Sequence, residues 1–255
     1  MRFDSEGIIL KQVKLPNGVR LTVLFSEKFG KISAGSRINE GGKNKSALAM
    51  RPFTYGRYSG FKNRDTYTVD SAETIRSYYG IGEDIDKYMA ASYIVELTEK
   101  ITPYDQPMPA LLSLLKDFLN LLEIRKKGYD TLVCAYIVKA VKIMGLMPQL
   151  ERCAVCGCSI DSPETLSVGD GGIVCKKCTE NTENKGNDTL IYKVSFDIVE
   201  VLKYFAKKPI SDFKNLVLEE DMQHKVMAII KSYISYHLDV GTLKSESLMV
   251  KNSGR

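Results

Sequence analysis

The first eighty residues alternate between apolar and polar positions in short runs, which is the period of β-strands with one buried face. Turn signals separate the runs at Pro16-Asn17-Gly18 and Phe29-Gly30, and a loop rich in Gly, Asn and Lys spans residues 39–46. Strands are therefore expected at residues 7–10, 20–25, 31–34, 53–58 and 67–69. Five short strands in this length fit a small closed β-barrel, for which the five-stranded OB-fold is the expected form.

From about Ser71 the apolar positions change to a helical period. A first apolar stripe is expected to face a core, at Ile85, Tyr88, Met89, Ser92 and Val95. After prolines that break the pattern, a second stripe consists of Leu111, Leu114, Leu115, Phe118 and Leu122. Further helices are expected at 131–144, 195–205 and 221–237, and the polar residues from Lys244 on are expected to fray.

Two Cys-x2-Cys pairs, separated by eighteen residues, are the most specific chemical pattern in the chain: Cys153, Cys156, Cys175 and Cys178. Each pair can occupy a tight knuckle that directs two thiolates to one point, and four thiolates complete a closed tetrahedral zinc site. Such a site has no open position for water or substrate. The pattern therefore predicts one structural Zn²⁺ ion without a catalytic role.

Other roles for the cysteines stay open on spacing alone. Two disulfides, unrelated free thiols, or a thiol redox enzyme that uses one Cys-x-x-Cys pair are the alternatives. No secretory signal opens the chain, which favours zinc. Cys158 is a substitute ligand or a bystander, and Cys134, in an apolar stretch, is expected to be a buried thiol.

These patterns predict an α+β multidomain protein. Residues 1–80 form the OB-fold barrel, 81–150 the first part of a helical domain, 151–190 the four-cysteine zinc module with a polar linker at 181–188, and 191–250 the second part of the helical domain. The zinc module is thus expected between two halves of one helical bundle.

Charge is concentrated at the start of the chain. Residues 1–80 hold fourteen Lys and Arg against seven Asp and Glu, whereas the remainder holds 22 basic and 24 acidic residues. A basic barrel favours a polyanionic partner, although a solvated basic face is the alternative. No apolar run reaches the roughly eighteen residues that a membrane span needs, so a cytoplasmic protein is expected.

Basic and aromatic residues interleave along the predicted barrel, a combination that can follow phosphates and stack bases with little sequence preference. The candidate DNA-binding cations are Lys31, Arg37, Lys43, Lys45, Arg51 and Arg57. Among the aromatic residues, Phe53 is expected to be buried, and either Tyr55 or Tyr58 is a candidate for the surface.

No set of residues predicts catalysis. Only two histidines are present, His224 and His237, and their separation does not place them on one helical turn. The zinc-deaminase pattern is missing, and Gly41-Gly42-Lys43 lacks the spacing and the Ser or Thr of a P-loop. The protein is therefore expected to be a binding protein and not an enzyme.

Several segments together resemble the bacterial recombination mediator RecO family, and the resemblance covers essentially the whole chain. The segments, in the family's order, are Glu6-Gly7-Ile8-Ile9-Leu10, Phe29-Gly30-Lys31-Ile32-Ser33, Pro52-Phe53-Thr54-Tyr55-Gly56, Tyr93-Ile94-Val95-Glu96-Leu97, Gly145-Leu146-Met147-Pro148-Gln149-Leu150 ahead of the first cysteine pair, and Tyr236-His237-Leu238. The first hairpin departs from the family, because Leu15-Pro16-Asn17-Gly18 stands where a more acidic turn is expected.

The resemblance implies a nucleoid-associated protein that binds single- and double-stranded DNA through its OB-fold, anneals complementary strands, and works with RecR to load RecA onto DNA coated with the single-strand-binding protein SSB. It also implies that the acidic C-terminal tail of SSB docks on the helical part, for which Arg125, Lys126, Lys139 and Lys142 are candidates. The alternative is a zinc-ribbon adaptor that binds RNA or acts in transcription, which recognition of the 2′-hydroxyl would distinguish.

Overall fold

The computed structural model describes residues 1–15, 20–36, 38, 45–64, 66–183 and 190–246, with the backbone alone at Lys45 and at 181–183. The chain forms two compact units. One comprises Met1–Arg125 together with the described residues from Thr242 on, and the other comprises Lys126–Gly241. The first unit therefore contains two long helices in addition to the strands that the sequence assigns to a separate domain of residues 1–80.

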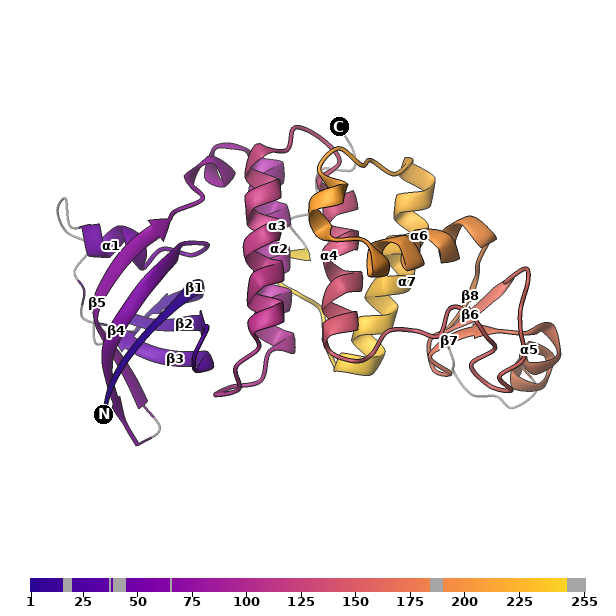
Figure 1. The fold of residues 1–255 in the computed structure, drawn as a ribbon, viewed down its shortest axis with the longest axis horizontal. Coiled ribbons are helices and arrows are strands. Elements are labelled where there is room, and N and C mark those ends of the chain that lie inside the picture. The colour runs from indigo at the N-terminus through magenta and orange to yellow at the C-terminus, as the bar shows by residue number, and fades with distance from the viewer. Residues whose placement is uncertain (16–19, 37, 39–44, 65, 184–189, 247–255) are drawn as a thin grey trace. The chain divides into compact units, whose positions relative to one another are not determined.

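The strands of the first unit close into a five-stranded barrel in the order β1-β2-β3-β5-β4 (Figure 1). The elements are β1 (Arg2–Lys14), β2 (Arg20–Ser26), β3 (Gly30–Ser36), α1 (Lys45–Ala49), β4 (Tyr55–Asn63) and β5 (Thr66–Arg76). Strand β1 pairs with both β2 and β4, and a short parallel pairing of β3 with β5 completes the ring. The five strands and the OB-fold barrel predicted from the sequence are confirmed.

Large apolar side chains fill the barrel from every strand, including Ile9, Leu24, Ile32 and Val69. Tyr58 is fully buried, and its hydroxyl donates to the carbonyl of Ala49 at 2.8 Å, which fixes the end of α1 over the barrel. The aromatic predictions were wrong in detail. Both Tyr55 and Tyr58 are buried and Phe53 is half-buried. Tyr58 fills an inward position of the small closed barrel, whereas Tyr55 is covered outside it, where its ring lies 4.0 Å from the ammonium group of Lys116 on α3 (Pro109–Ile124).

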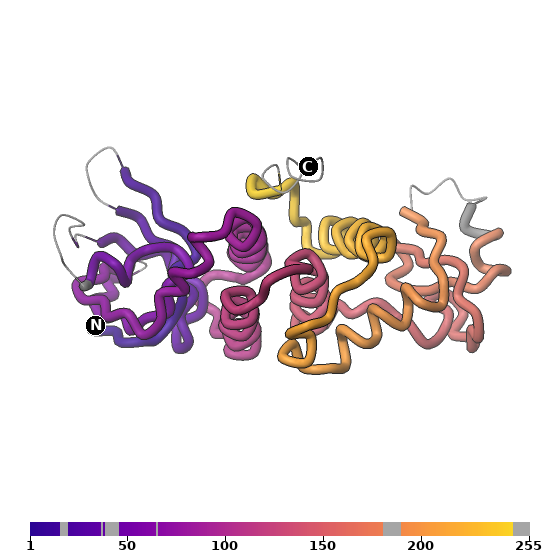
Figure 2. Tube along the Cα trace, turned by 90° about the horizontal axis from the view of Figure 1, so that it is seen from above, coloured from indigo at the N-terminus to yellow at the C-terminus, as the bar shows by residue number. Residues whose placement is uncertain are grey.

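Strand β5 continues to Arg76, where it pairs with Tyr55 of β4, so the helical period expected from Ser71 was wrong. A short 3-10 helix, η1 (Tyr79–Glu83), leads to α2 (Ile85–Ile101), which is followed by α3 (Pro109–Ile124). The carboxylate of Asp84 caps α2 by accepting from the N–H groups of Asp86 and Lys87. Helices α2 and α3 lie side by side in both views (Figures 1 and 2).

Helix α2 is buried on most of its surface and not along one stripe, since β1 and α3 both pack against it. Met89 and Val95 are buried as predicted, but Ile85 and Tyr88 are 65% and 43% exposed. Helix α3 follows its predicted stripe, with all five of the named apolar residues buried.

The loop between α2 and α3 packs on the barrel. The N–H of Asp105 donates to the carbonyl of Lys31 at 3.0 Å, and the hydroxyl of Tyr67 donates to the carboxylate of Asp105 at 3.0 Å. Gly30, in the left-handed region at φ 69°, lies against the backbone of Gln106, where a Cβ would be 2.0 Å from the carbonyl oxygen. These contacts join the barrel to its helices within one unit.

The second unit contains three longer helices, α4 (Tyr129–Ile143), α6 (Phe196–Lys207) and α7 (Glu220–Leu238), with a short 3-10 helix, η2 (Ile210–Phe213), after α6. These three helices pack against one another, and Figure 2 shows their backbones as neighbours. The ammonium group of Lys142 donates to the carbonyl of Ala206 at 2.9 Å, and that of Lys139 donates to the carbonyl of Lys208. These two lysines thus satisfy carbonyl groups at the end of α6.

Between α4 and α6 lies a small module, as predicted. It contains β6 (Thr165–Ser167), β7 (Gly172–Val174), α5 (Lys176–Glu183) and β8 (Ile191–Lys193), with a sheet in the order β7-β6-β8. Helix α5 extends into the predicted linker, and the remaining linker residues, 184–188, lie outside the described residues. His237 of α7 hydrogen-bonds through Nε2 to the carbonyl of Val168 at 2.7 Å, which is a structural role.

The segment after Thr242 is held in place at Glu96 of α2. The carboxylate of Glu96 accepts from the N–H groups of Lys244 and Ser245 at 3.0 and 2.8 Å, and from the hydroxyl of Ser245 at 2.6 Å. The expectation of fraying from Lys244 on was therefore wrong for residues 244–246. Within the part of the chain that the structure describes, the helices are too short or too polar to cross a bilayer.

Candidate nucleic-acid interface and metal centre

Two of the predicted DNA-binding cations lie on the barrel surface. Arg57 projects from β4 with 56% of its side chain exposed, and Arg51 is exposed in the turn between α1 and β4. Arg37 and Lys43 lie outside the described residues, and Lys45 begins α1 with a side chain that is also outside them. The structure therefore places Arg51 just before the start of β4 and Arg57 just after it.

Lys31 is not on the surface. It is 6% exposed, its ammonium group donates to the carbonyl of Glu99 at 2.6 Å, and it lies 4.2 Å from the centre of the Tyr104 ring. Burial lowers the pKa of Lys31 from its ordinary value. This burial does not fit the expectation that Lys31 faces DNA, and its contacts instead hold α2 and the following loop against β3.

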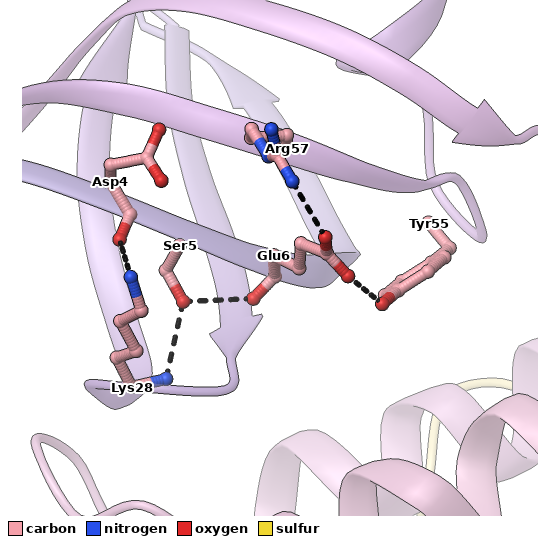
Figure 3. A network of polar contacts seen from close by, with 6 residues as sticks. All are labelled: Asp4, Ser5, Glu6, Lys28, Tyr55 and Arg57. Atoms are coloured by element: carbon pink, nitrogen blue, oxygen red, sulfur yellow. Dashed lines mark hydrogen bonds and ion pairs between the residues drawn. The ribbon is translucent and has the colours of Figure 1, made fainter.

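Arg57 belongs to a polar network at the seam where β1 pairs with β4 (Figure 3). Its guanidinium group donates to Glu6 Oε1 at 3.1 Å, and the hydroxyl of Tyr55 donates to Glu6 Oε2. The hydrogen bond from Tyr55 and then that from Arg57 lower the pKa of Glu6 from its ordinary value of 4.5. A phosphate that binds Arg57 must therefore compete with the carboxylate of Glu6.

The Glu6 network predicts a pH-dependent contribution to stability. Because the pKa of Glu6 is lowered in the folded state, its contribution is present above pH 4.5 and is lost as the pH falls through the folded value. Glu6→Gln should lower the free energy of unfolding by about 0.5–1.5 kcal/mol at pH 7, the ordinary contribution of one hydrogen bond. Urea unfolding of both proteins at several pH values measures this difference, and a difference that does not shrink in acid would contradict it.

Further exposed cations on the barrel were missed by the sequence reasoning. They occupy outward positions of strands and the adjoining turns, and they are Arg2, Lys11, Lys14 and Lys28. A period-two alternation of charged with buried residues along residues 2–7 is the signal that could have found Arg2, but four consecutive buried residues then interrupt it ahead of Lys11 and Lys14. Lys11 is partly engaged by Glu99, with 3.5 Å between its ammonium nitrogen and Oε1.

The four predicted thiols come together in the second unit. The sulfur atoms of Cys153, Cys156, Cys175 and Cys178 all lie within 4.8 Å of one another, and those of Cys156 and Cys175 are 3.8 Å apart. Bonds of about 2.3 Å to a tetrahedral zinc ion would place sulfur atoms about 3.8 Å apart. The four cysteines could therefore bind a metal ion such as zinc.

The backbone around the cluster forms the two expected knuckles. In the first, the N–H of Gly157 donates to the carbonyl of Cys153 at 2.9 Å, with Gly157 in the left-handed region at φ 73°. In the second, which starts α5, the N–H of Cys178 donates to the carbonyl of Cys175 at 2.9 Å. The N–H of Cys175 also points at Cys153 Sγ, 3.4 Å away, and so connects the two knuckles.

Hydrogen bonds favour ionised sulfur in each knuckle. Burial opposes ionisation of Cys153, but backbone N–H groups of Cys156, Cys175 and Val155 outweigh it and lower the pKa of Cys153. A backbone N–H of Cys178 lowers the pKa of Cys175, whereas hydrogen bonds to the Cys175 and Cys156 sulfurs raise that of Cys178. The thiolate is the form that binds metal, so the backbone around Cys153 and Cys175 favours the metal-binding form of these two sulfurs.

The two remaining cysteines differ in environment. Cys158 is exposed in the first knuckle, where its carbonyl accepts from the N–H of Cys153 at 2.9 Å. Hydrogen bonds with the sulfurs of Cys156 and then Cys175 raise the pKa of its thiol, but its sulfur is not one of the four that lie within 4.8 Å of one another. Cys134 is fully buried in α4, and burial raises the pKa of its thiol. The prediction of a buried thiol at Cys134 is confirmed.

Comparison with known proteins covers nearly the whole chain. The family model described as Recombination protein O N terminal matches residues 1–78, and that described as Recombination protein O C terminal matches residues 82–247. The boundary between the two matches lies close to the predicted end of the barrel domain.

Curated relatives agree with these matches. The DNA repair protein RecO of Thermoanaerobacter sp. (strain X514) is 29% identical over 237 residues, which cover 92% of each chain. That of Alkaliphilus metalliredigens is 28% identical over 239 residues, 94% of this chain and 95% of the relative, and that of Caldanaerobacter subterraneus is 26% identical over 254 residues, 99% and 100% of the two chains. The chain therefore belongs to the RecO family of DNA repair proteins.

Proposed function

We propose that this protein is a non-enzymatic recombination mediator that binds single- and double-stranded DNA and anneals complementary strands. The observation that carries the proposal is a closed five-stranded barrel with exposed cations in a chain that both RecO family models match. Exposed Arg and Lys side chains attract phosphates of any sequence, so the expected binding is salt-dependent and weakly selective.

The proposed interface consists of the surface of the barrel and its basic loop. Arg51 and Arg57 are its described members, and Arg37, Lys43 and Lys45 are proposed on their charge and their place in the sequence. Lys31 is left out because it is buried.

We further propose that the four cysteines hold one structural Zn²⁺ ion, which stabilises the module between α4 and α6. The support is the closed set of four sulfur atoms, which leaves no ligand position for a substrate. The ion would be a folding element of the second unit.

In keeping with the family, the proposed partners are RecR, the C-terminal tail of SSB and, indirectly, RecA. Two of the cations considered for the SSB tail, Lys139 and Lys142, bind carbonyl groups at the end of α6, and Arg125 is buried. Lys126 is exposed and stays a candidate for binding the SSB tail.

We propose that the protein acts in the cytoplasm, in association with the nucleoid.

Annealing of complementary oligonucleotides coated with SSB tests the proposed function. We expect the purified protein, with RecR added in a parallel arm, to raise the annealing rate above that of the coated strands alone. A competition with matched RNA strands belongs to the same experiment, because a clear preference for RNA would favour an RNA-binding adaptor. No acceleration on coated or naked strands would contradict the proposal.

Replacement of Lys43 and Lys45 by alanine should weaken DNA binding and flatten its salt dependence. Each phosphate contact contributes about 0.7–0.9 to the slope of log K against log salt, so the slope should fall by roughly one to two. Titrations of labelled DNA at several salt concentrations measure the slope. The control is the double substitution Lys207→Ala and Lys225→Ala, which changes two exposed lysines of the second unit. An unchanged salt slope after replacement of Lys43 and Lys45 would mean that the loop does not contact DNA.

A further inference from the structure

A groove of about 1020 Å³ opens on the first unit, along β5 and between the turn that precedes β4 and the start of α2 (elements labelled in Figure 1). One wall comes from residues 51–54, a second from residues 72–74, and a third from residues 77–88. Its size is at the upper end of the range for small-molecule sites. The groove is distinct from the Glu6 network, since none of the residues in that network lines it.

Two exposed aromatic rings line the groove. Tyr79 is 69% exposed and Tyr88 is 43% exposed, and the ring of Tyr88 meets that of Phe53 edge to face with 5.7 Å between the ring centres. Exposed aromatic rings in a concave site lose contact with water when a flat partner covers them. The lining therefore favours a ligand with planar, unpaired rings.

Two aromatic residues that line the groove, Phe53 and Tyr78, have strained backbones. Phe53 has φ 69° and Tyr78 has φ 48°, both in the left-handed region that bulky residues rarely adopt. Such conformations cost about 1–3 kcal/mol each and concentrate at functional sites. The strained residues are neighbours of the exposed rings: Phe53 contacts the ring of Tyr88, and Tyr78, which is 3% exposed, directly precedes Tyr79.

Charged groups at the groove match a nucleotide. Arg51 provides an exposed cation for a phosphate. Glu73 and Glu83 also line the groove, and carboxylates can accept hydrogen bonds from the exocyclic amino groups of bases. A phosphate would thus meet Arg51, while base edges would meet the acidic residues.

We propose that this groove holds unstacked bases of single-stranded DNA, with Tyr79 and Tyr88 as stacking platforms and Arg51 as a phosphate contact. The inference rests on the proposed function and adds to it a reason for preferring single strands, because bases inside a duplex cannot enter a groove of this kind. A cationic peptide is the other class of ligand that such a lining would accept.

Binding of a labelled single strand and of a blunt duplex of the same sequence to the full chain tests the proposal. Tyr79→Leu and Tyr88→Leu remove the ring and keep apolar bulk, whereas Tyr79→Phe and Tyr88→Phe keep the ring. Loss of one base stack, about 1–3 kcal/mol, corresponds to roughly a five-fold or larger rise in the Kd for the single strand. We expect this rise in each Leu variant, near wild-type values in each Phe variant, and duplex binding within about two-fold of wild type.

Tyr236→Leu is the matched control, because Tyr236 is 57% exposed on α7 in the second unit and does not line the groove. Quenching of 2-aminopurine in the single strand gives a direct readout of stacking, and it should weaken in the Leu variants alone. Unchanged single-strand binding, or an equal loss for strand and duplex, would overturn the groove proposal. Wild-type protein that binds neither DNA would overturn the proposed function itself, which is a separate result.

Discussion

Cys175→Ser should abolish zinc binding and unfold the module that spans residues 151–180. Serine cannot supply the thiolate that completes the closed set of four, and apparent binding energies of structural zinc sites are about 10–16 kcal/mol, most of which is also folding energy. The substitution also removes the sulfur that lies 3.8 Å from that of Cys156. We expect zinc content to fall from about one ion per chain to near zero, measured by metal analysis after gel filtration.

Cys158→Ser is the matched control for this result. Cys158 lies in the first knuckle and is exposed, but its sulfur is outside the group of four. The Cys158→Ser variant should keep its zinc. Hydrogen exchange should show protected amides in the module of Cys158→Ser and rapidly exchanging amides in that of Cys175→Ser. The barrel lies in the other compact unit and should stay protected in both. Full zinc in Cys175→Ser, or loss of zinc in Cys158→Ser, would show that the ligand set is different.

Gly30→Ala should lower the stability of the first unit by about 2–5 kcal/mol. A left-handed residue with a Cβ costs roughly 1–2 kcal/mol, and an atom forced into a packed site costs a further 1–3 kcal/mol. The new Cβ would lie 2.0 Å from the carbonyl oxygen of Gln106, so β3 and the loop after α2 must separate. Urea unfolding measures the loss, and hydrogen exchange of β3 assigns it to this unit.

Gly82→Ala provides the comparison, since a Cβ at Gly82 would meet nothing within 4 Å and the residue is in the same unit. It should leave the free energy of unfolding within about 0.5 kcal/mol of wild type, the usual range for surface changes. Equal stabilities of Gly30→Ala and wild type would mean that the barrel does not need its contact with the loop at Gln106.

The barrel could be predicted because its signal is local. Alternation along residues 20–25 and 31–34, with a turn at Phe29-Gly30, indicates a hairpin wherever the rest of the chain lies. The end of β5 could not be predicted in this way. Residues 71–76 have no strong strand pattern, and their strand comes from pairing with β4.

The cluster of four cysteines was equally accessible from the sequence, since two residues between cysteines determine a knuckle by themselves. The burial of Lys31 could not be predicted from the sequence. Its neighbours along β3 look like those of a surface strand, and its burial depends on a carbonyl at Glu99, which is 68 residues away. Sequence spacing carries no information about such a contact.

Helix α2 shows the same limit. Its expected stripe assumed one buried face, but contacts with β1, η1 and α3 bury most of its surface and leave Ile85 and Tyr88 exposed instead. The exposed Tyr88 became visible as part of a groove only with the fold, because Phe53 and Tyr79 come from separate segments. Tertiary packing thus determined the features of this surface that periodicity missed.

Binding of naked labelled oligonucleotides across a salt series shows whether the barrel binds the DNA backbone through its surface cations. We expect clear binding of single and double strands at about 50 mM salt, with log K falling linearly as log salt rises to about 200 mM. Absence of binding even in dilute buffer, or an affinity that does not change with salt, would contradict binding of the DNA backbone by these cations.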